Sequence, residues 1–348
     1  MTDRTKSTTT LLVLGLALGL ASARGAAGAE RQCLPCGGVV SDEPGALIPL
    51  LASPPALQKK DVLYLAWPVP LAGESDIENA TVARNAASKG FTPWLKLEFS
   101  AAPPLKGSTA LEAEIARVAS IAHHAPAGTH FELDWGHGSL SAEEVSDYAY
   151  LLKRAAVAIS GAGDEDKVVT EPLPADTALL SALYSNDVAA YVDMIALAPD
   201  TASNERSALA KLTELDPGKP VALDALPFPP APDGVLSAAA RSATAGFAVT
   251  LFAAPPLESA ALAPLKVLAR EFAGDLSPDP DSAPSGPEGT ETWAFVRGKD
   301  LGLRVVVASR ERPAQLELEF DDPQLRRPTR VDLTSGADTS VFDFQPRH

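Results

Sequence analysis

The segment His130–His137, HFELDWGH, has the residue pattern from which the fold can be predicted. Its acidic residues Glu132 and Asp134 alternate with apolar ones, which is the two-residue period of a β-strand. The segment Glu143–Ile159 then shows apolar residues at the spacing of an amphipathic helix. Two carboxylates on one face of a strand are costly to bury unless a pocket or a partner compensates them. The segment therefore predicts a strand that carries candidate site residues and leads into a helix.

The same strand-then-helix unit recurs along the chain. Strands are predicted at residues 61–69, 91–99, 130–135, 167–171, 191–198, 219–226 and 247–253. An eighth strand would have to come from residues 38–51, where the pattern is poor, or is missing. Repeated βα units indicate a parallel sheet, and seven or eight of them favour a (β/α)8 barrel over a doubly wound sheet. No Gly-rich phosphate loop follows the first strand, which argues against a nucleotide-binding sheet.

The first 29 residues predict a secretory signal peptide. The basic residues Arg4 and Lys6 precede the apolar run Leu11–Leu20, and small residues suited to cleavage follow it. The apolar run is short for a membrane span, so an uncleaved anchor is the lesser alternative. We therefore expect a secreted or periplasmic protein with no membrane association beyond its export signal.

Cys33 and Cys36 are the only cysteines in the chain. Their C-x-x-C spacing allows a redox pair, but no thioredoxin-like unit surrounds them. A small local disulfide in an oxidising compartment is the favoured interpretation.

The chain divides into five predicted parts. These are the signal peptide (1–29), an irregular N-terminal segment (30–60), the barrel (61–275), a Pro/Ser-rich linker (276–290) and a C-terminal β domain (291–348). After the linker, short strands with alternating apolar and polar residues replace the strand–helix units, which is typical of an antiparallel sheet.

Composition and charge narrow the range of partners. The net charge of −16 argues against nucleic acid, which requires basic patches. The histidines lack metal-ligand spacing with other ligands, so neither a metal nor a cofactor is expected.

The candidate site lies at the C-terminal ends of the predicted barrel strands, where barrel enzymes place their functional groups. Carboxylates beside aromatic faces suit carbohydrate chemistry, because acids transfer protons at the glycosidic oxygen and aromatic rings stack on sugars. The candidate residues are Glu98, Glu132, Asp134, Glu171, Asp224, Trp67, Trp94, Trp135 and His137. The alternatives are that each carboxylate is solvated, caps a helix or pairs with a Lys or Arg, and that the tryptophans belong to the core.

The segment Phe131–Pro172 resembles the fourth strand, following helix and fifth strand of clan A (β/α)8 glycoside hydrolases, with the closest similarity to xylosidase/iduronidase-like and cellulase-like members. Residues 191–199 and 219–225 resemble their sixth and seventh strands. The resemblance implies a (β/α)8 barrel followed by a small antiparallel β-sandwich, and a glycosidase activity.

The resemblance fails at the two positions that would carry catalysis. It places Gly136 where the acid/base glutamate of the family stands, and Ala225 where the nucleophile stands. The best substitutes are Asp134 as acid/base and Asp224 as nucleophile or base, with Glu98, Glu132, Glu171, Trp67, Trp94, Trp135 and His137 as substrate-binding residues. Two hypotheses follow: a glycoside-hydrolase-like barrel that acts on or binds extracellular carbohydrate, and a non-catalytic scaffold (a pseudoenzyme) that binds a glycan or a protein.

Overall fold

The computed structural model describes residues 36–41, 51, 62–72, 76–163, 165–229, 234–253, 267–270, 272, 276–298, 301–309, 315–320, 329–332 and 339–344. The chain divides into two compact units, residues 1–32 and 33–348, and all the described residues belong to the second. The predicted signal peptide lies outside the described residues.

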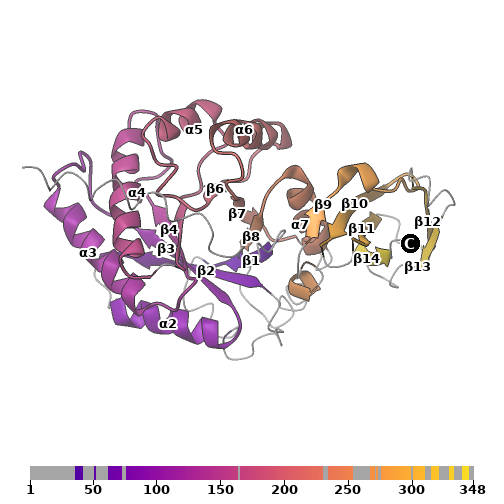
Figure 1. The fold of residues 1–348 in the computed structure, drawn as a ribbon, viewed down its shortest axis with the longest axis horizontal. Helices are drawn as coiled ribbons and strands as arrows, with labels where there is room; N and C mark the ends of the chain where they lie inside the picture. Colours follow the sequence, from indigo (N-terminus) through magenta and orange to yellow (C-terminus); the bar gives the residue numbers. More distant parts are fainter. Residues whose placement is uncertain are drawn as a thin grey trace, which may run out of the picture. The chain divides into compact units, whose positions relative to one another are not determined.

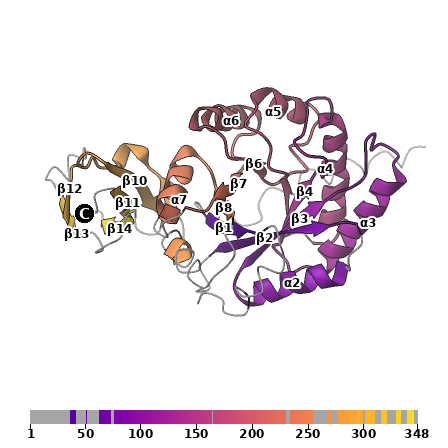
Figure 2. The same ribbon diagram turned by 180° about the vertical axis from the view of Figure 1, so that it is seen from behind.

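Eight parallel strands form the barrel (Figures 1 and 2). In chain order they are β1 (Cys36–Val40), β2 (Leu63–Pro70), β3 (Thr92–Glu98), β4 (His130–Asp134), β5 (Lys167–Thr170), β6 (Ile195–Leu197), β7 (Val221–Pro227) and β8 (Val249–Ala253). The order in the sheet is β5-β4-β3-β2-β1-β8-β7-β6. Two isolated parallel bridges, Val169 to Met194 and Leu173 to Leu197, join β5 to β6 and complete the ring. The predicted (β/α)8 barrel is confirmed.

Helices follow the strands of the barrel from β2 to β7. They are α2 (Asp76–Ser88), α3 (Thr109–His124), α4 (Val145–Ser160), α5 (Thr177–Tyr184), α6 (Ala202–Leu215) and α7 (Gly234–Ala245). Their buried residues pack with outward-facing strand residues in one large core; α4, for example, contributes Val145, Tyr148 and Leu152 at helical spacing. Within the described ranges, none of these helices has the length and apolarity needed to cross a membrane.

The first strand lies inside the segment 30–60, which we predicted to be irregular. β1 pairs with both β2 and β8, so the barrel begins at Cys36. The strand was hard to predict because Gly37 and Gly38 give it little strand propensity. Both glycines have a packing reason: a Cβ at Gly37 would lie 2.1 Å from a methyl carbon of Leu268. Cys36 itself is disulfide-bonded, and the sequence holds one other cysteine, Cys33.

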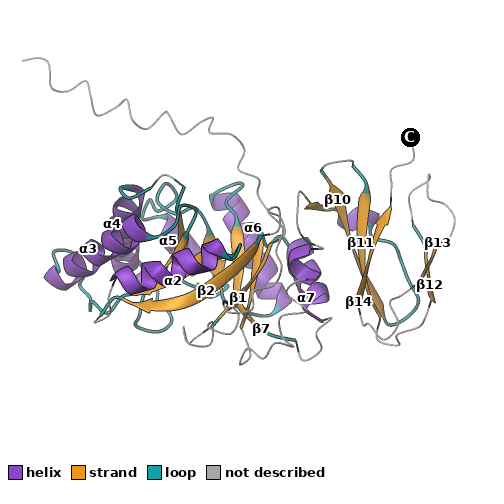
Figure 3. Cartoon of the chain, turned by 90° about the horizontal axis from the view of Figure 1, so that it is seen from below, coloured by secondary structure: helices purple, strands orange, loops and turns teal. Residues whose placement is uncertain are grey.

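The C-terminal part is antiparallel, as predicted (Figure 3). One sheet has the order β14-β11-β10-β9, and a second pairs two strands; the bounds are β9 (Leu276–Pro278), β10 (Thr290–Arg297), β11 (Leu303–Ser309), β12 (Gln315–Leu318), β13 (Thr329–Asp332) and β14 (Thr339–Phe344). Ala294, Val305 and Leu318 share a core between the two sheets, which makes this a small β-sandwich. β9 lies within the predicted linker and pairs with β10, so that segment belongs partly to the sheet.

Candidate functional site

Three facing pairs of residues on β3 and β4 point into the barrel. In order toward the C-terminal ends of the strands they are Trp94–His130, Lys96–Glu132 and Glu98–Asp134. Because side chains alternate between the two faces of a strand, residues two apart lie one above another on the inner face. Toward the C-terminal ends of the strands, where we predicted the site, the interior side chains therefore change from aromatic to charged.

The lowest of these layers is an aromatic floor, formed by Tyr64, Trp94 and His130. The Trp94 ring stacks on that of His130 with centroids 5.1 Å apart, and Tyr64 meets both rings edge-on. Trp94 is fully buried, and its indole Nε1 donates a hydrogen bond of 2.7 Å to Glu132 Oε2. This floor fills the barrel beneath the charged residues.

The predicted tryptophan platforms need correction. Trp67 and Trp135 are as fully buried as Trp94, but they lie on the outer side of the strands, in the core beneath the helices. Trp135, for example, packs edge-on against Tyr148 of α4. Trp67 and Trp135 thus face the helices, and Trp94 faces the interior but is fully buried in the aromatic floor, so none of the three rings offers a face to a ligand.

A buried ion triad occupies the middle layer. The ammonium of Lys96 lies 2.5 Å from Asp224 Oδ2 and 3.2 Å from Glu132 Oε1. Glu132 is 0% exposed and Asp224 1% exposed, whereas the Lys96 side chain retains 12% exposure. Both acids are candidate residues in the sequence, whereas Lys96 is not among them, although the alternation in the strand FTPWLKLEF places it on the same face as Trp94.

Within the triad, burial and the neighbouring charges shift the pKa values in opposite directions. Burial raises the pKa of Glu132 to about 8, although the Lys96 charge opposes the shift. Burial lowers the pKa of Lys96, but the charges of Glu132 and Asp224 outweigh burial and raise it overall. Lys96 is therefore an ammonium at neutral pH.

The upper layer holds a pair of half-buried carboxylates. Glu98 and Asp134 face each other across β3 and β4, and Gly136 N donates a hydrogen bond of 2.8 Å to Asp134 Oδ1. Burial and the negative charge of Asp134 together raise the pKa of Glu98, and Lys96 opposes them. Among the described residues, none donates a hydrogen bond to the Glu98 carboxyl group or forms an ion pair with it.

Glu171 follows β5 and is held from two sides. Its Oε2 accepts a hydrogen bond of 2.7 Å from Trp135 N. Its own N–H donates to the Tyr148 hydroxyl, which in turn donates to the Leu133 carbonyl oxygen. Burial raises the pKa of Glu171 to about 8, opposed by the Trp135 N–H and aided by the charge of Asp134. The carboxyl group is therefore mainly protonated at neutral pH.

We expect the free energy of unfolding to depend less on pH in Glu171→Gln than in the wild type. The pKa of Glu171 rises from 4.5 to about 8 on folding, so the folded state binds the proton more tightly. This stabilisation is complete below pH 4.5 and is lost as the pH rises through about 8. Glutamine imitates the protonated form and does not titrate, so urea denaturation should show the variant gaining on the wild type between about pH 4.5 and 8, with a constant difference above pH 8. Glu214→Gln, on the surface of α6, is the control. If the difference in unfolding free energy between the wild type and Glu171→Gln does not change with pH, the raised pKa of Glu171 is contradicted.

Gly136 and Ala225 align with the catalytic glutamates of the family that the sequence resembles, and both have a left-handed backbone conformation. Gly136 has φ +73°, and a Cβ there would lie 1.8 Å from the carbonyl oxygen of Phe99. Ala225 has φ +56° and is exposed, at a register shift of β7 that immediately follows Asp224. Bulges of this kind commonly redirect side chains beside functional sites. Neither position therefore has the backbone of an ordinary strand-end glutamate.

His137 lies in the exposed turn after β4. Its Nε2 is 2.9 Å from the Ala101 carbonyl oxygen, and its ring meets Trp135 edge-on. The side chain thus ties the loop after β4 to the loop after β3. The structure does not bring its ring to the inward-facing carboxylates by any hydrogen bond among the described residues.

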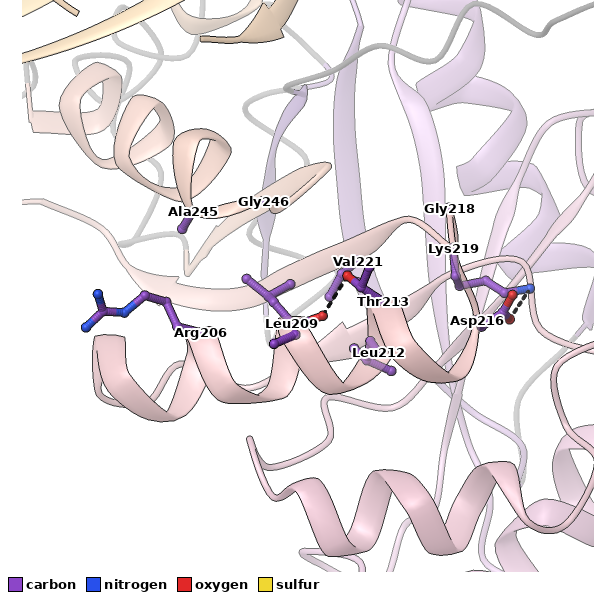
Figure 4. A pocket seen from close by; sticks show the side chains of 11 residues that line it. Arg206, Leu209, Leu212, Thr213, Asp216, Gly218, Lys219, Val221, Ala245 and Gly246 are labelled. Atoms are coloured by element: carbon purple, nitrogen blue, oxygen red, sulfur yellow. Dashed lines mark hydrogen bonds and ion pairs between the residues drawn. The ribbon is translucent and has the colours of Figure 1, made fainter. Parts of the chain in front are cut away.

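In the described part of the chain, no group of three or more His, Cys, Asp or Glu is arranged to hold a metal ion. A pocket of about 300 Å³ lies elsewhere, between α6 and the start of β7 (Figure 4). Lys219 in this pocket already bonds Asp216 Oδ2 and the carbonyl oxygens of Ala189 and Val192. An ammonium has three donors, so this one has none left for a ligand.

No protein-family model and no curated protein matches this sequence. Solved structures do match its fold. A GH39 β-xylosidase from Caulobacter crescentus superposes with a TM-score of 0.53 at 14% identity, covering 93% of this chain and 98% of that one. A Bacteroides fragilis protein assigned as an α-galactosidase/melibiase gives 0.51 at 10% identity, covering 90% and 80%. The fold is therefore a (β/α)8 barrel, similar in structure to these two proteins, followed by an antiparallel β domain.

Proposed function

We propose that this protein binds carbohydrate at the C-terminal end of its barrel and does not hydrolyse it with the Asp134 and Asp224 pair. One observation carries the proposal: the Asp224 carboxylate is 1% exposed and bound to the Lys96 ammonium. A nucleophile must reach the anomeric carbon, and a base must reach a water beside it. Asp224 in this arrangement reaches neither.

Binding at this end is supported by the carboxylates that remain accessible. Glu98 and Asp134 are half-buried at the strand ends, where barrels place their ligands. Carboxylates accept strong hydrogen bonds from hydroxyl groups. The fold likeness to a β-xylosidase makes a sugar the first ligand to test, although the likeness itself concerns the fold.

We also propose that the protein is exported. Support comes from the predicted signal peptide at residues 1–29 and from the disulfide bond at Cys36, which is typical of proteins in oxidising compartments.

The second candidate function is hydrolysis by a different pair of carboxyl groups, those of Glu171 and Asp134. Glu171 is mainly protonated at neutral pH, as a general acid must be, and it lies close enough to Asp134 for that charge to raise its pKa. Two neighbouring carboxyl groups in different environments are the usual arrangement for acid and base roles. In this alternative Glu171 donates the proton and Asp134 acts as base or nucleophile.

A glycan array with the secreted protein tests both candidates. We expect retention of at least one oligosaccharide class without cleavage, and weakening by about tenfold or more in Glu98→Gln and Asp134→Asn, each of which removes a charged acceptor. Glu214→Gln should bind as the wild type does. Bond cleavage that disappears in Glu171→Gln would favour the second candidate. If no glycan is either bound or cleaved, the carbohydrate proposal is wrong.

A further inference from the structure

We propose that the disulfide at Cys36 is a redox-sensitive lock that holds the first strand, β1, in the barrel. Cys36 is disulfide-bonded, and Cys33 is the only other cysteine in the chain, so within one molecule the bond joins these two. The inference goes beyond the proposed carbohydrate function and does not depend on it. It comes from the place of β1 in the ring of strands and from the few side chains that hold it there.

Strand β1 joins two halves of the ring, β5-β4-β3-β2 on one side and β8-β7-β6 on the other. It pairs with β2 over residues 37–40 and with β8 over residues 36–40. On the opposite side of the ring, the described residues of β5 and β6 are joined only by two isolated bridges. Among the described strands, therefore, β1 alone connects the two halves through continuous ladders, and its departure would open the barrel.

The side chains of β1 contribute little to keeping it in place. Two of its five residues are Gly37 and Gly38, where neighbouring side chains leave no room for a Cβ. The other three, Cys36, Val39 and Val40, are buried. Glycines also lose more conformational freedom on becoming ordered than other residues do. An added constraint on the chain therefore has a large effect on whether this strand stays docked.

The disulfide supplies such a constraint at the start of the strand. Cys36 is the first residue of β1, is 3% exposed and belongs to the same interior cluster as Tyr64 and Trp94. Its N–H donates a hydrogen bond of 3.0 Å to the Ala248 carbonyl oxygen. A cross-link to Cys33 restricts the chain when β1 is detached, so detachment gains less conformational entropy. The oxidised chain therefore favours the docked strand.

Reduction by a dithiol would remove the constraint. A thiolate of the dithiol attacks one sulfur of the Cys33–Cys36 bond, and the other cysteine leaves as a thiolate that takes a proton from water. The second thiol of the reductant, once deprotonated, attacks the mixed disulfide, closes a cyclic disulfide and releases the first cysteine, which is protonated in turn. The protein gains two electrons and two protons, and the dithiol loses the same number.

The loosening should be local, because a second connection between the two halves does not involve the disulfide. The Lys96 ammonium on β3 is bound to Asp224 on β7, so an ion pair crosses the interior from one half to the other. Strand β4 lies between β3 and β5 and keeps both neighbours when β1 leaves. We therefore expect reduction to release β1, and to expose the edges of β2 and β8, without unfolding the whole barrel.

Hydrogen–deuterium exchange of the oxidised full-length protein, with and without excess dithiothreitol, tests the inference. We expect the amides of residues 36–41 to exchange about tenfold or more faster after reduction, the scale of the constraint from a small disulfide loop. The amides of β4, residues 130–134, should change little. Cys33→Ser, which keeps Cys36 in place, should exchange at residues 36–41 as fast as the reduced wild type, with or without dithiothreitol.

Three results would overturn the inference. Alkylation after denaturation measures how much of the bond is reduced, and a bond that resists dithiothreitol in the folded protein is not a redox-sensitive lock. If the bond is reduced but residues 36–41 exchange at an unchanged rate, the disulfide does not hold β1. If residues 130–134 accelerate by the same factor as residues 36–41, the disulfide stabilises the whole barrel and not its first strand.

Discussion

Replacing Gly136 with alanine is expected to cost about 2–5 kcal/mol of unfolding free energy, because the left-handed backbone costs about 1–2 kcal/mol and overpacking about 1–3. The φ of +73° disfavours any side chain, and the new Cβ would overlap the Phe99 carbonyl oxygen at 1.8 Å. That carbonyl belongs to the backbone, so it can move away only if the end of β3 moves with it. Urea denaturation of the wild type and the variant measures the cost.

Gly138 is a matched control two residues further along the same turn. Its φ is +85°, but a Cβ there would meet nothing within 4 Å. Gly138→Ala should therefore show only the backbone cost of about 1–2 kcal/mol. If the two variants lose equal stability, the close approach of Phe99 is not what requires glycine at position 136. The same geometry means that Gly136→Glu should not create a glycosidase, because the position cannot hold a side chain without displacing β3.

Replacing Lys96 with methionine is expected to destabilise the protein by about 3–5 kcal/mol at neutral pH, the usual cost of removing one partner from a buried ion pair. Methionine keeps much of the apolar volume but leaves Glu132 and Asp224 without their cation. The loss should diminish at low pH, because protonation removes the uncompensated charge. Denaturant titrations at acidic and neutral pH measure both effects.

Two further variants separate charge from packing. Lys211→Met removes the cation of a surface pair with Glu214, and it should cost no more than about 1 kcal/mol. The triple variant Lys96→Met, Glu132→Gln, Asp224→Asn replaces all three charges with neutral groups of similar size and should recover most of the lost stability. If the triple variant is as unstable as Lys96→Met alone, packing rather than charge explains the effect of Lys96.

Most of the barrel could be predicted from the sequence because parallel strands buried on both faces leave a strong, repeated signal. The exception was β1, whose glycines remove the side chains from which a strand is recognised. Those glycines are explained only by neighbours such as Leu268, far away in the sequence. Strand β9 was missed for a related reason: its three residues, Leu276–Pro278, resemble a linker until β10 pairs with them.

The candidate site was predicted less well than the fold. The two-residue period shows which side chains share a face, but it does not show which face turns inward. Trp67 and Trp135 therefore seemed equivalent to Trp94, although only Trp94 lies inside the barrel. Lys96 was overlooked because a lone lysine in a strand usually lies in solvent. Its importance depends on Asp224, a contact 128 residues away.

Among the described residues, the aromatic floor of Tyr64, Trp94 and His130 closes the barrel interior on one side of Glu132. Water and protons that reach Glu132 along the barrel interior must come from the side of Lys96, since Trp94 blocks the other side. A ligand seated on Glu98 and Asp134 would cover that side. Proton exchange between Glu132 and the solvent should therefore be slower in the ligand-bound protein than in the free protein.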